Sequence, residues 1–204
     1  MAPDGVTGGY HRATLEKLAP GGYLKPYGKS PHLRLETRYY ADLAGLDHGF
    51  ESYGELYAAS ILANRSAALP IDIEEGYRIT HTVFHVTDFG CQRPGIPEDD
   101  RKRAYHIVDQ LTDHFVEVNH WDLTAEFVLS QFCLGVDPTR TRSGAAGIRR
   151  LMEVQTPGGA IPGRFIEQRL DESAPADVFF RRAYHTTLVT ALASMVILSA
   201  PHDG

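Results

Sequence analysis

Apolar and polar residues follow one another along most of this chain with the period of an α-helix. After a segment rich in Gly, Pro and Tyr over residues 1–32, apolar positions recur every three or four residues, which is the spacing of one buried helix face. Strict two-residue alternation, the pattern of a strand, covers no stretch of six residues or more, and its nearest approach is a short piece over 69–73. The pattern therefore predicts an all-α chain in which residues 33–204 form one helical domain.

Capping residues and helix breakers indicate where the helices begin and end. Ser52 with Glu55 three residues later has the pattern of a capping box, and Asp72 is a second N-cap candidate. Gly90 and Gly135 suit the position just after a helix. We therefore expect about seven or eight helices joined by short loops, the clearest of them over 33–44, 52–64, 73–89, 99–118, 123–134, 143–154 and 177–198.

Composition excludes several classes of protein. Of the 204 residues, 43% are hydrophobic and 23% charged, and the net charge is −6; no basic stripe of the kind that nucleic-acid binders carry is present. No apolar run reaches the roughly 18 to 20 residues that a membrane-spanning helix needs. Two cysteines make no disulfide framework, and the first residues lack the apolar core of a signal peptide. We therefore expect a cytoplasmic protein with no nucleic-acid or membrane partner.

The most informative segment, residues 79–90, places two histidines and an aspartate on one predicted helix. His81, His85 and Asp88 recur at i, i+4 and i+7, so on a helix all three point from one face. Two imidazoles four residues apart can chelate one metal ion, and a carboxylate one turn later can complete the site. His81, His85 and Asp88 are therefore candidate metal ligands, and the alternative for each histidine is a buried ring that satisfies one hydrogen bond.

Two further polar clusters lie on otherwise apolar helices. Asp122 and Glu126 are one turn apart, so both carboxylates can share a helix face, although Asp122 also suits the N-cap of the helix over 123–134. His185 follows Tyr184 within the strongly apolar final helix. Imidazole and carboxylate pairs are the groups that move protons in general acid–base catalysis. The candidate catalytic residues are therefore His81, Asp88, Asp122, Glu126 and His185.

Several familiar motifs are absent from the sequence. It contains no Gly-x-Gly-x-x-Gly or Walker loop, which excludes the common nucleotide-binding patterns, and no Gly-x-Ser-x-Gly elbow. The segment His81-Thr-Val-Phe-His85 lacks the glutamate of the zinc-protease motif, and no Asp-rich motif for a magnesium-bound diphosphate is present. The candidate histidine and carboxylate ligands make a divalent metal such as zinc a possible cofactor.

Residues 150–159, Arg-Leu-Met-Glu-Val-Gln-Thr-Pro-Gly-Gly, resemble the helix-end motif of α/α-toroid proteins, in which helical hairpins stack in a ring. In terpene cyclases of that class a Trp follows the glycines, whereas this chain has Ala160. Thr-His-Thr-Val-Phe over 80–84, Trp-Asp-Leu-Thr-Ala-Glu over 121–126 and Tyr-His-Thr-Thr over 184–187 are similar to motifs of an uncharacterised bacterial family of unknown function associated with natural-product gene clusters. These resemblances imply an incomplete α/α toroid or open helical arc and a biosynthetic context, and they imply no particular reaction.

Two functional hypotheses follow. In the first, the chain is an enzyme of specialised metabolism whose His/Asp acid–base or metal site lies in a helical funnel, with a small molecule or a peptide as substrate. Cyclisation, isomerisation, lyase chemistry and hydrolysis all fit such a site. In the second, the chain is a non-catalytic helical module that binds a peptide or a partner protein in its concave face. Both hypotheses are compatible with a homo-oligomer.

Overall fold

The computed structural model describes residues 13–14, 17, 19–92, 96–163 and 174–199, and it confirms the predicted all-α class. These described ranges contain helices, turns and loops and no strand, so the 69–73 piece is not one. The 3-10 turns are η1 (Ala19–Gly21) and η2 (Pro138–Arg140). The α-helices are α2 (Pro31–Ala44), α3 (Tyr53–Ala58), α4 (Ile61–Asn64), α5 (Ile73–Thr87), α6 (Glu98–Glu117), α7 (Trp121–Cys133), α8 (Arg142–Val154) and α9 (Ala176–Ser199).

Capping explains most of these bounds. Ser52 and Glu55 form the predicted capping box at the start of α3, and Asp72 forms another at the start of α5. The single helix predicted over 52–64 is instead two short helices, because the Ser60 side chain accepts a hydrogen bond from the backbone N–H of Ala63 and starts α4 as a separate helix.

Two helix ends beside the candidate residues differ from the prediction. The helix expected over 73–89 ends at Thr87, because Asp88 has a left-handed backbone with φ of 49°. At the other end of this region, α7 begins at Trp121 because Nδ1 of His120 accepts the backbone N–H of Leu123 at 3.2 Å. The prediction that Asp122 is the N-cap is therefore wrong. Asp122 lies inside the first turn of α7, and its side chain is buried.

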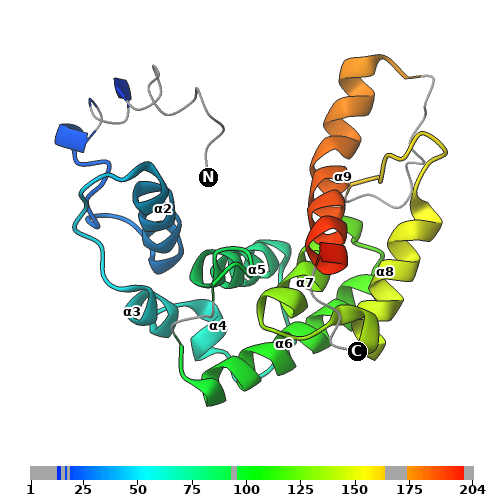
Figure 1. The fold of residues 1–204 in the computed structure, drawn as a ribbon, viewed down its shortest axis with the longest axis horizontal. Helices are drawn as coiled ribbons and strands as arrows, with labels where there is room; N and C mark the ends of the chain where they lie inside the picture. The colour runs from blue at the N-terminus through cyan, green and yellow to red at the C-terminus, as the bar shows by residue number, and fades with distance from the viewer. Residues whose placement is uncertain (1–12, 15–16, 18, 93–95, 164–173, 200–204) are drawn as a thin grey trace.

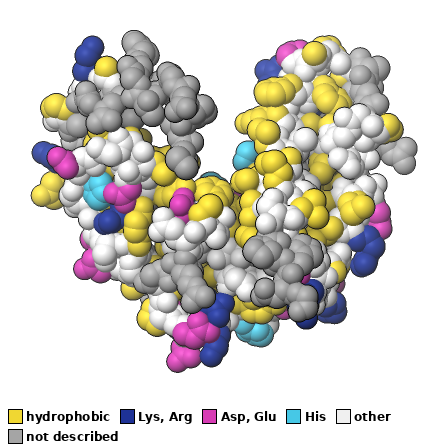
Figure 2. Space-filling view, in the orientation of Figure 1, with side chains coloured by type: hydrophobic (Ala, Val, Ile, Leu, Met, Phe, Trp, Pro, Cys, Tyr) yellow, Lys and Arg dark blue, Asp and Glu magenta, His cyan; other side chains and the backbone are white. Residues whose placement is uncertain are grey.

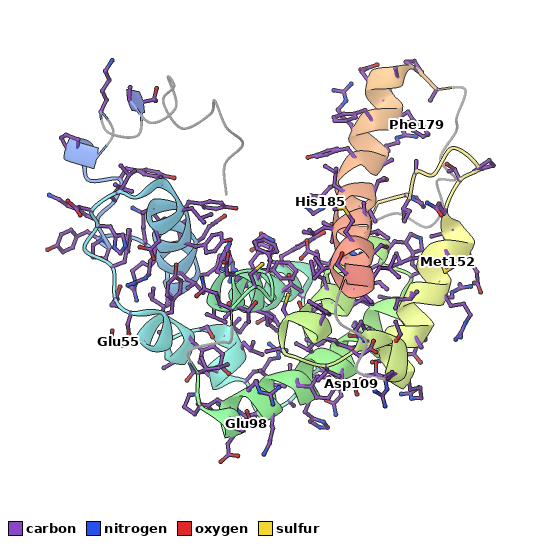
Figure 3. The ribbon with its side chains drawn as sticks, in the orientation of Figure 1. Glu55, Glu98, Asp109, Met152, Phe179 and His185 are labelled. Carbon is purple, nitrogen blue, oxygen red and sulfur yellow. The ribbon has the colours of Figure 1, made fainter. Side chains whose placement is uncertain are left out.

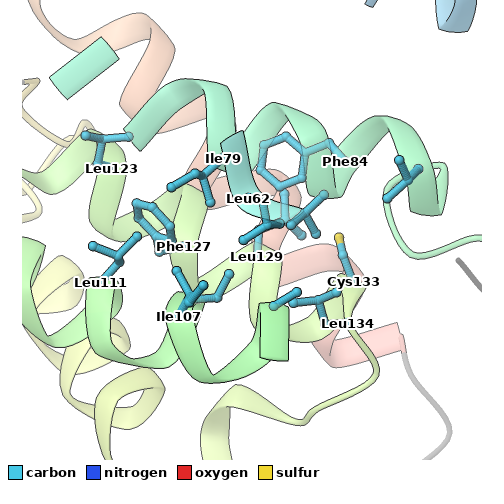
Figure 4. Packing of buried hydrophobic residues seen from close by; sticks show 14 of the residues in the cluster. Leu62, Ile79, Phe84, Ile107, Leu111, Leu123, Phe127, Leu129, Cys133 and Leu134 are labelled. Atoms are coloured by element: carbon cyan, nitrogen blue, oxygen red, sulfur yellow. The ribbon is translucent and has the colours of Figure 1, made fainter. Parts of the chain in front are cut away.

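Helix α7 is the central helix of the fold. Every residue of α7 except Phe132 is buried, and α5, α6, α8 and α9 all pack against it. On the side of α5 and α6, Phe127 and Leu129 pack among Ile79, Phe84 and Leu111 (Figure 4). A helix that is enclosed on all sides carries apolar side chains at nearly every position, so any charged residue on α7 requires a specific polar partner.

The other helices leave one side of α5 open. In Figure 1, α2 and α9 rise on opposite sides of α5, with α3 and α4 below α2, and α8 beside α9. The space-filling view of the same face is hollowed between the part built by α2 and the part built by α9 (Figure 2). None of the described helices combines the length and the apolar character required to cross a membrane.

Candidate functional site

Asp122 is the centre of a polar cluster that joins three helices. Its Oδ1 lies 2.8 Å from Nδ1 of His185 and accepts the hydroxyl of Thr186 at 2.8 Å, both from α9. Its Oδ2 accepts the hydroxyl of Tyr77 from α5 at 2.5 Å. Only 6% of the Asp122 side chain is exposed. A buried carboxylate with three charge-assisted hydrogen bonds is held in one position and one orientation.

The hydrogen bonds of Asp122 determine its protonation state. Burial by itself raises the pKa of Asp122, but the hydrogen bonds from His185, Tyr77 and Thr186 stabilise the charged form and together outweigh burial. The resulting pKa lies below the ordinary aspartate value. Asp122 is therefore a carboxylate, and not a carboxylic acid, at neutral pH.

Glu126 lies one turn further along α7 and faces α5. Its side chain is 1% exposed, and its Oε2 accepts the hydroxyl of Thr80 and lies 3.9 Å from Nε2 of His81. One turn of helix separates Asp122 from Glu126, so the two carboxylates line the same face of α7, as their spacing predicts. The structure therefore brings His81, Asp122, Glu126 and His185 into one cluster, with contributions from α5, α7 and α9.

His185 is the most accessible member of this cluster. About half of its side chain (49%) is exposed, and Figure 3 shows it midway along α9, on the side that faces the hollow. Nδ1 is the ring nitrogen that points to Asp122. His185 therefore presents more of its side chain to solvent than His81 or the two buried carboxylates do.

His81 begins a row of aromatic and imidazole rings that runs from α5 toward α2. The centroid of its ring lies 5.9 Å from that of His32 and 5.9 Å from that of His85, and the His85 ring lies 4.8 Å from that of Tyr39. Burial lowers the pKa of His81 to about 4 and that of His85 to about 3, with smaller contributions from neighbouring imidazoles. Both rings are therefore neutral at pH 7.

Asp88 is separate from this cluster. Its Oδ1 accepts the hydroxyl of Tyr39 at 2.8 Å, and its Oδ2 accepts the side-chain amide of Gln92 at 3.3 Å. The left-handed backbone at Asp88 takes it off the helix face that carries His81 and His85. The proposed role of Asp88 as a catalytic residue or metal ligand stays a prediction. Its backbone has a structural role as the C-cap of α5, with the N–H of Asp88 bonded to the carbonyl oxygen of Phe84.

The described part of the chain contains one group of three residues whose candidate metal-binding atoms all lie within 4.8 Å of one another. Its members are Asp122, Glu126 and His185. The predicted set of His81, His85 and Asp88 does not form such a group. It stays a prediction, and the geometry favours the carboxylates of α7 instead.

Sequence reasoning missed the residues that hold the cluster together. Tyr77 and Thr80 precede His81 on α5 by about one turn or less, and Thr186 is adjacent to His185. Their hydroxyls bond to the two buried carboxylates. The signal available in the sequence was the position of two carboxylates on the most apolar helix, because such groups require donors from neighbouring helices.

Comparison with known proteins places the chain in a family without assigning an activity. No curated protein matches the chain, and neither does any solved structure. A family model described as a domain of unknown function, DUF6895, matches residues 1–195, which include every member of the polar cluster. The chain belongs to the DUF6895 family of domains of unknown function.

Proposed function

We propose that this protein is an enzyme that transfers protons through His185, with Asp122 as the carboxylate that orients the imidazole. The observation that carries the proposal is the 2.8 Å contact between Nδ1 of His185 and Oδ1 of Asp122, in which a half-exposed imidazole meets a buried and firmly held carboxylate. Surface ion pairs are common without function, but a carboxylate with three donors beneath an accessible imidazole matches the arrangement that enzymes use to activate histidine.

In this mechanism Asp122 fixes the tautomer of His185. The carboxylate accepts the proton on Nδ1, so Nε2 carries the lone pair that takes a proton from a substrate. As Nε2 is protonated, the ring becomes an imidazolium, and the negative charge of Asp122 stabilises it. The proton then returns from Nε2 to another atom of the substrate or to a leaving group.

His81 and Glu126 form the second half of the proposed site. Because burial lowers the pKa of His81 to about 4, its ring at pH 7 offers one hydrogen-bond donor and one acceptor and no positive charge. Glu126 lies 3.9 Å away, deeper in the fold. This pair can orient a polar substrate group beside His185, which suits isomerisation, cyclisation, elimination or hydrolysis.

The surroundings favour a small molecule or a peptide as substrate. Apolar side chains border the hollow between the parts built by α2 and α9 (Figure 2). Both helices also carry exposed aromatic side chains, among them Tyr40 on α2 and Phe180 on α9. The sequence resemblances imply that the helices form an open arc and that the enzyme acts in specialised metabolism.

Chemical modification tests the reactivity of His185 without a known substrate. Diethyl pyrocarbonate acylates neutral imidazole nitrogens, and mass spectrometry gives the rate at each histidine. We expect His185 to react faster than the exposed His106, and we expect Asp122→Asn to slow His185 at least several-fold while His106 is unchanged. Equal rates at His185 in wild type and Asp122→Asn would overturn the proposal. A screen of small-molecule and peptide substrates, with His185→Gln as the control, then identifies the reaction.

A second candidate function, binding of a peptide or partner protein without catalysis, has one observation in its favour. Large apolar side chains at helical spacing are exposed along α9 beside the hollow (Figure 2). Binding that persists in both His185→Gln and Asp122→Asn, with no turnover in wild type, would favour this function. The exposed side chains are Phe180, Tyr184, Leu188, Met195 and Leu198.

A further inference from the structure

The cluster around Asp122 contains the donor types of a transition-metal site. Asp122 and Glu126 supply carboxylate oxygens from α7, His185 supplies an imidazole from α9, and the candidate ligand atoms of these three residues lie within 4.8 Å of one another. His81 adds a second imidazole from α5, with Nε2 3.9 Å from Oε2 of Glu126. Helical proteins commonly build metal sites in this way, from inward-facing side chains on adjacent helices.

We propose that Asp122, Glu126 and His185 together bind one divalent transition-metal ion such as Zn²⁺, and that His81, which lies outside this group of three but beside Glu126, supplies the fourth ligand. This inference rests on the same cluster as the proposed function. With the ion bound, the His185 ring is a ligand, so the proton transfer proposed for His185 belongs to the metal-free protein. Two imidazole nitrogens and two carboxylate oxygens suit zinc and its neighbours in the first transition series, whereas magnesium and calcium prefer oxygen ligands alone.

Burial distinguishes this cluster from an ordinary group of surface acids. The side chains of Asp122 and Glu126 are 6% and 1% exposed, and a carboxylate at such depth requires compensation for its lost hydration. On α7, which otherwise carries apolar and uncharged polar side chains, these are two charges on one face. A dication beside them would add to the compensation that the surrounding hydroxyls and His185 already give.

The surrounding hydroxyls fit the same inference. Tyr77 and Thr186 bond to Asp122, and Thr80 bonds to Glu126. Carboxylates that bind metals are themselves hydrogen-bonded by an outer set of residues, which fix the position of each ligand oxygen.

Titration of the full chain with Zn²⁺ tests the inference. After removal of metals by a chelator, calorimetry with ZnCl₂ is expected to give one ion per chain, and Co²⁺ in its place is expected to give the visible absorption of a site with nitrogen and oxygen ligands. Glu126→Gln and His81→Ala are each expected to weaken binding more than tenfold. The matched control, His106→Ala, removes an exposed histidine of α6 and is expected to leave the affinity unchanged. Equal Zn²⁺ affinity in wild type, Glu126→Gln and His81→Ala would overturn the inference, as would the absence of stoichiometric binding.

A second measurement uses wild-type protein alone and remains decisive if a variant fails to fold. Zn²⁺ at one equivalent is expected to protect His185 from acylation by diethyl pyrocarbonate at least tenfold, with no effect on His106. Unchanged acylation of His185 under saturating Zn²⁺ would overturn the metal site and leave the acid–base proposal standing. Conversely, Zn²⁺ protection together with equal metal-free rates in wild type and Asp122→Asn would support the metal site and overturn the acid–base role.

Discussion

Nδ1 of His185 lies 2.8 Å from Oδ1 of Asp122, although 63 positions separate the two residues in the sequence. The contact joins the surface of α9 to the first turn of α7, the most deeply enclosed helix of the fold. It also links a buried carboxylate to a solvent-exposed ring, because half of the His185 side chain is exposed whereas the Asp122 side chain is buried. The reactivity proposed for this protein depends on this one contact.

Removal of the Tyr77 hydroxyl is expected to weaken both the fold and the orientation of Asp122. Tyr77→Phe takes away the donor to Oδ2 and leaves a buried carboxylate oxygen short of a partner. We expect a loss in the free energy of unfolding on the order of 1 to 3 kcal/mol, measured by urea titration at pH 7. The control is Tyr27→Phe, at a ring that is 84% exposed. A stability equal to that of wild type would show that the Tyr77 hydroxyl does not contribute.

The stability of the metal-free protein is expected to fall as the pH drops below about 6.5, because of His85. Burial holds its pKa near 3 in the folded state, against 6.5 for an ordinary histidine. Well above pH 6.5 the ring is neutral in both states and contributes no pH dependence. Between pH 6.5 and about 3 the unfolded chain binds a proton that the folded chain does not, so the free energy of unfolding decreases by on the order of 4 kcal/mol over this range.

His85→Phe checks this assignment. Phenylalanine fills the same space among Tyr39 and Tyr40 and does not titrate. Urea unfolding at pH 7, 5.5 and 4.5 is expected to show a shallower loss of stability in the variant than in wild type. His81 has a lowered pKa as well, so a residual dependence in the same direction is expected. Identical slopes in the two proteins would contradict the buried position of His85.

Asp88→Asn tests whether Asp88 acts only as the C-cap of α5 or also belongs to the candidate site. Asparagine tolerates the left-handed backbone at this position, where φ is 49°, and its side-chain oxygen can still accept the Tyr39 hydroxyl. We expect a change in stability below about 1 kcal/mol, with no change in the acylation rate of His185 or in Zn²⁺ affinity. A large fall in the acylation rate of His185 or in the Zn²⁺ affinity would show that Asp88 contributes to the candidate site.

Because α8 packs closely against its neighbours, a methyl group added at a glycine of α8 is expected to lower stability by an amount that depends on the contact it makes. A Cβ at Gly144 would lie 2.4 Å from the backbone oxygen of Pro138, and one at Gly147 would lie 2.8 Å from Cγ2 of Val128. Both Gly→Ala variants are expected to lose about 1 to 3 kcal/mol in urea unfolding, with Gly144 the more sensitive because backbone moves less easily than a side chain. Gly49→Ala, where no atom lies within 4 Å of the added carbon, is the control. Equal stabilities of all three variants would contradict the packing described for α8.

The sequence by itself determined the class of the fold and most helix positions. Apolar spacing and caps act within a few residues, so the pattern along the chain predicted α6 and α9 to within two residues at each end. The pattern failed at the start of α7, where an uncommon residue type is the N-cap. Histidine is a rare N-cap, and the sequence favoured Asp122 for this position, yet the His120 ring packs between Phe115 and Tyr77 and caps α7.

Only the tertiary structure decided which polar residues meet. The sequence placed Asp122 and Glu126 on one helix face and His81, His85 and Asp88 on another. It named His185 on the final helix as a further member of one hypothetical site, without saying which pairs would touch. The fold instead places His81 beside Glu126 and His185 beside Asp122, and joins Asp88 to Tyr39. Helix periodicity says which face of one helix a residue occupies, whereas the pairing of faces depends on how α5, α7 and α9 pack. That packing is set by the sum of many long-range apolar contacts, which no local pattern encodes.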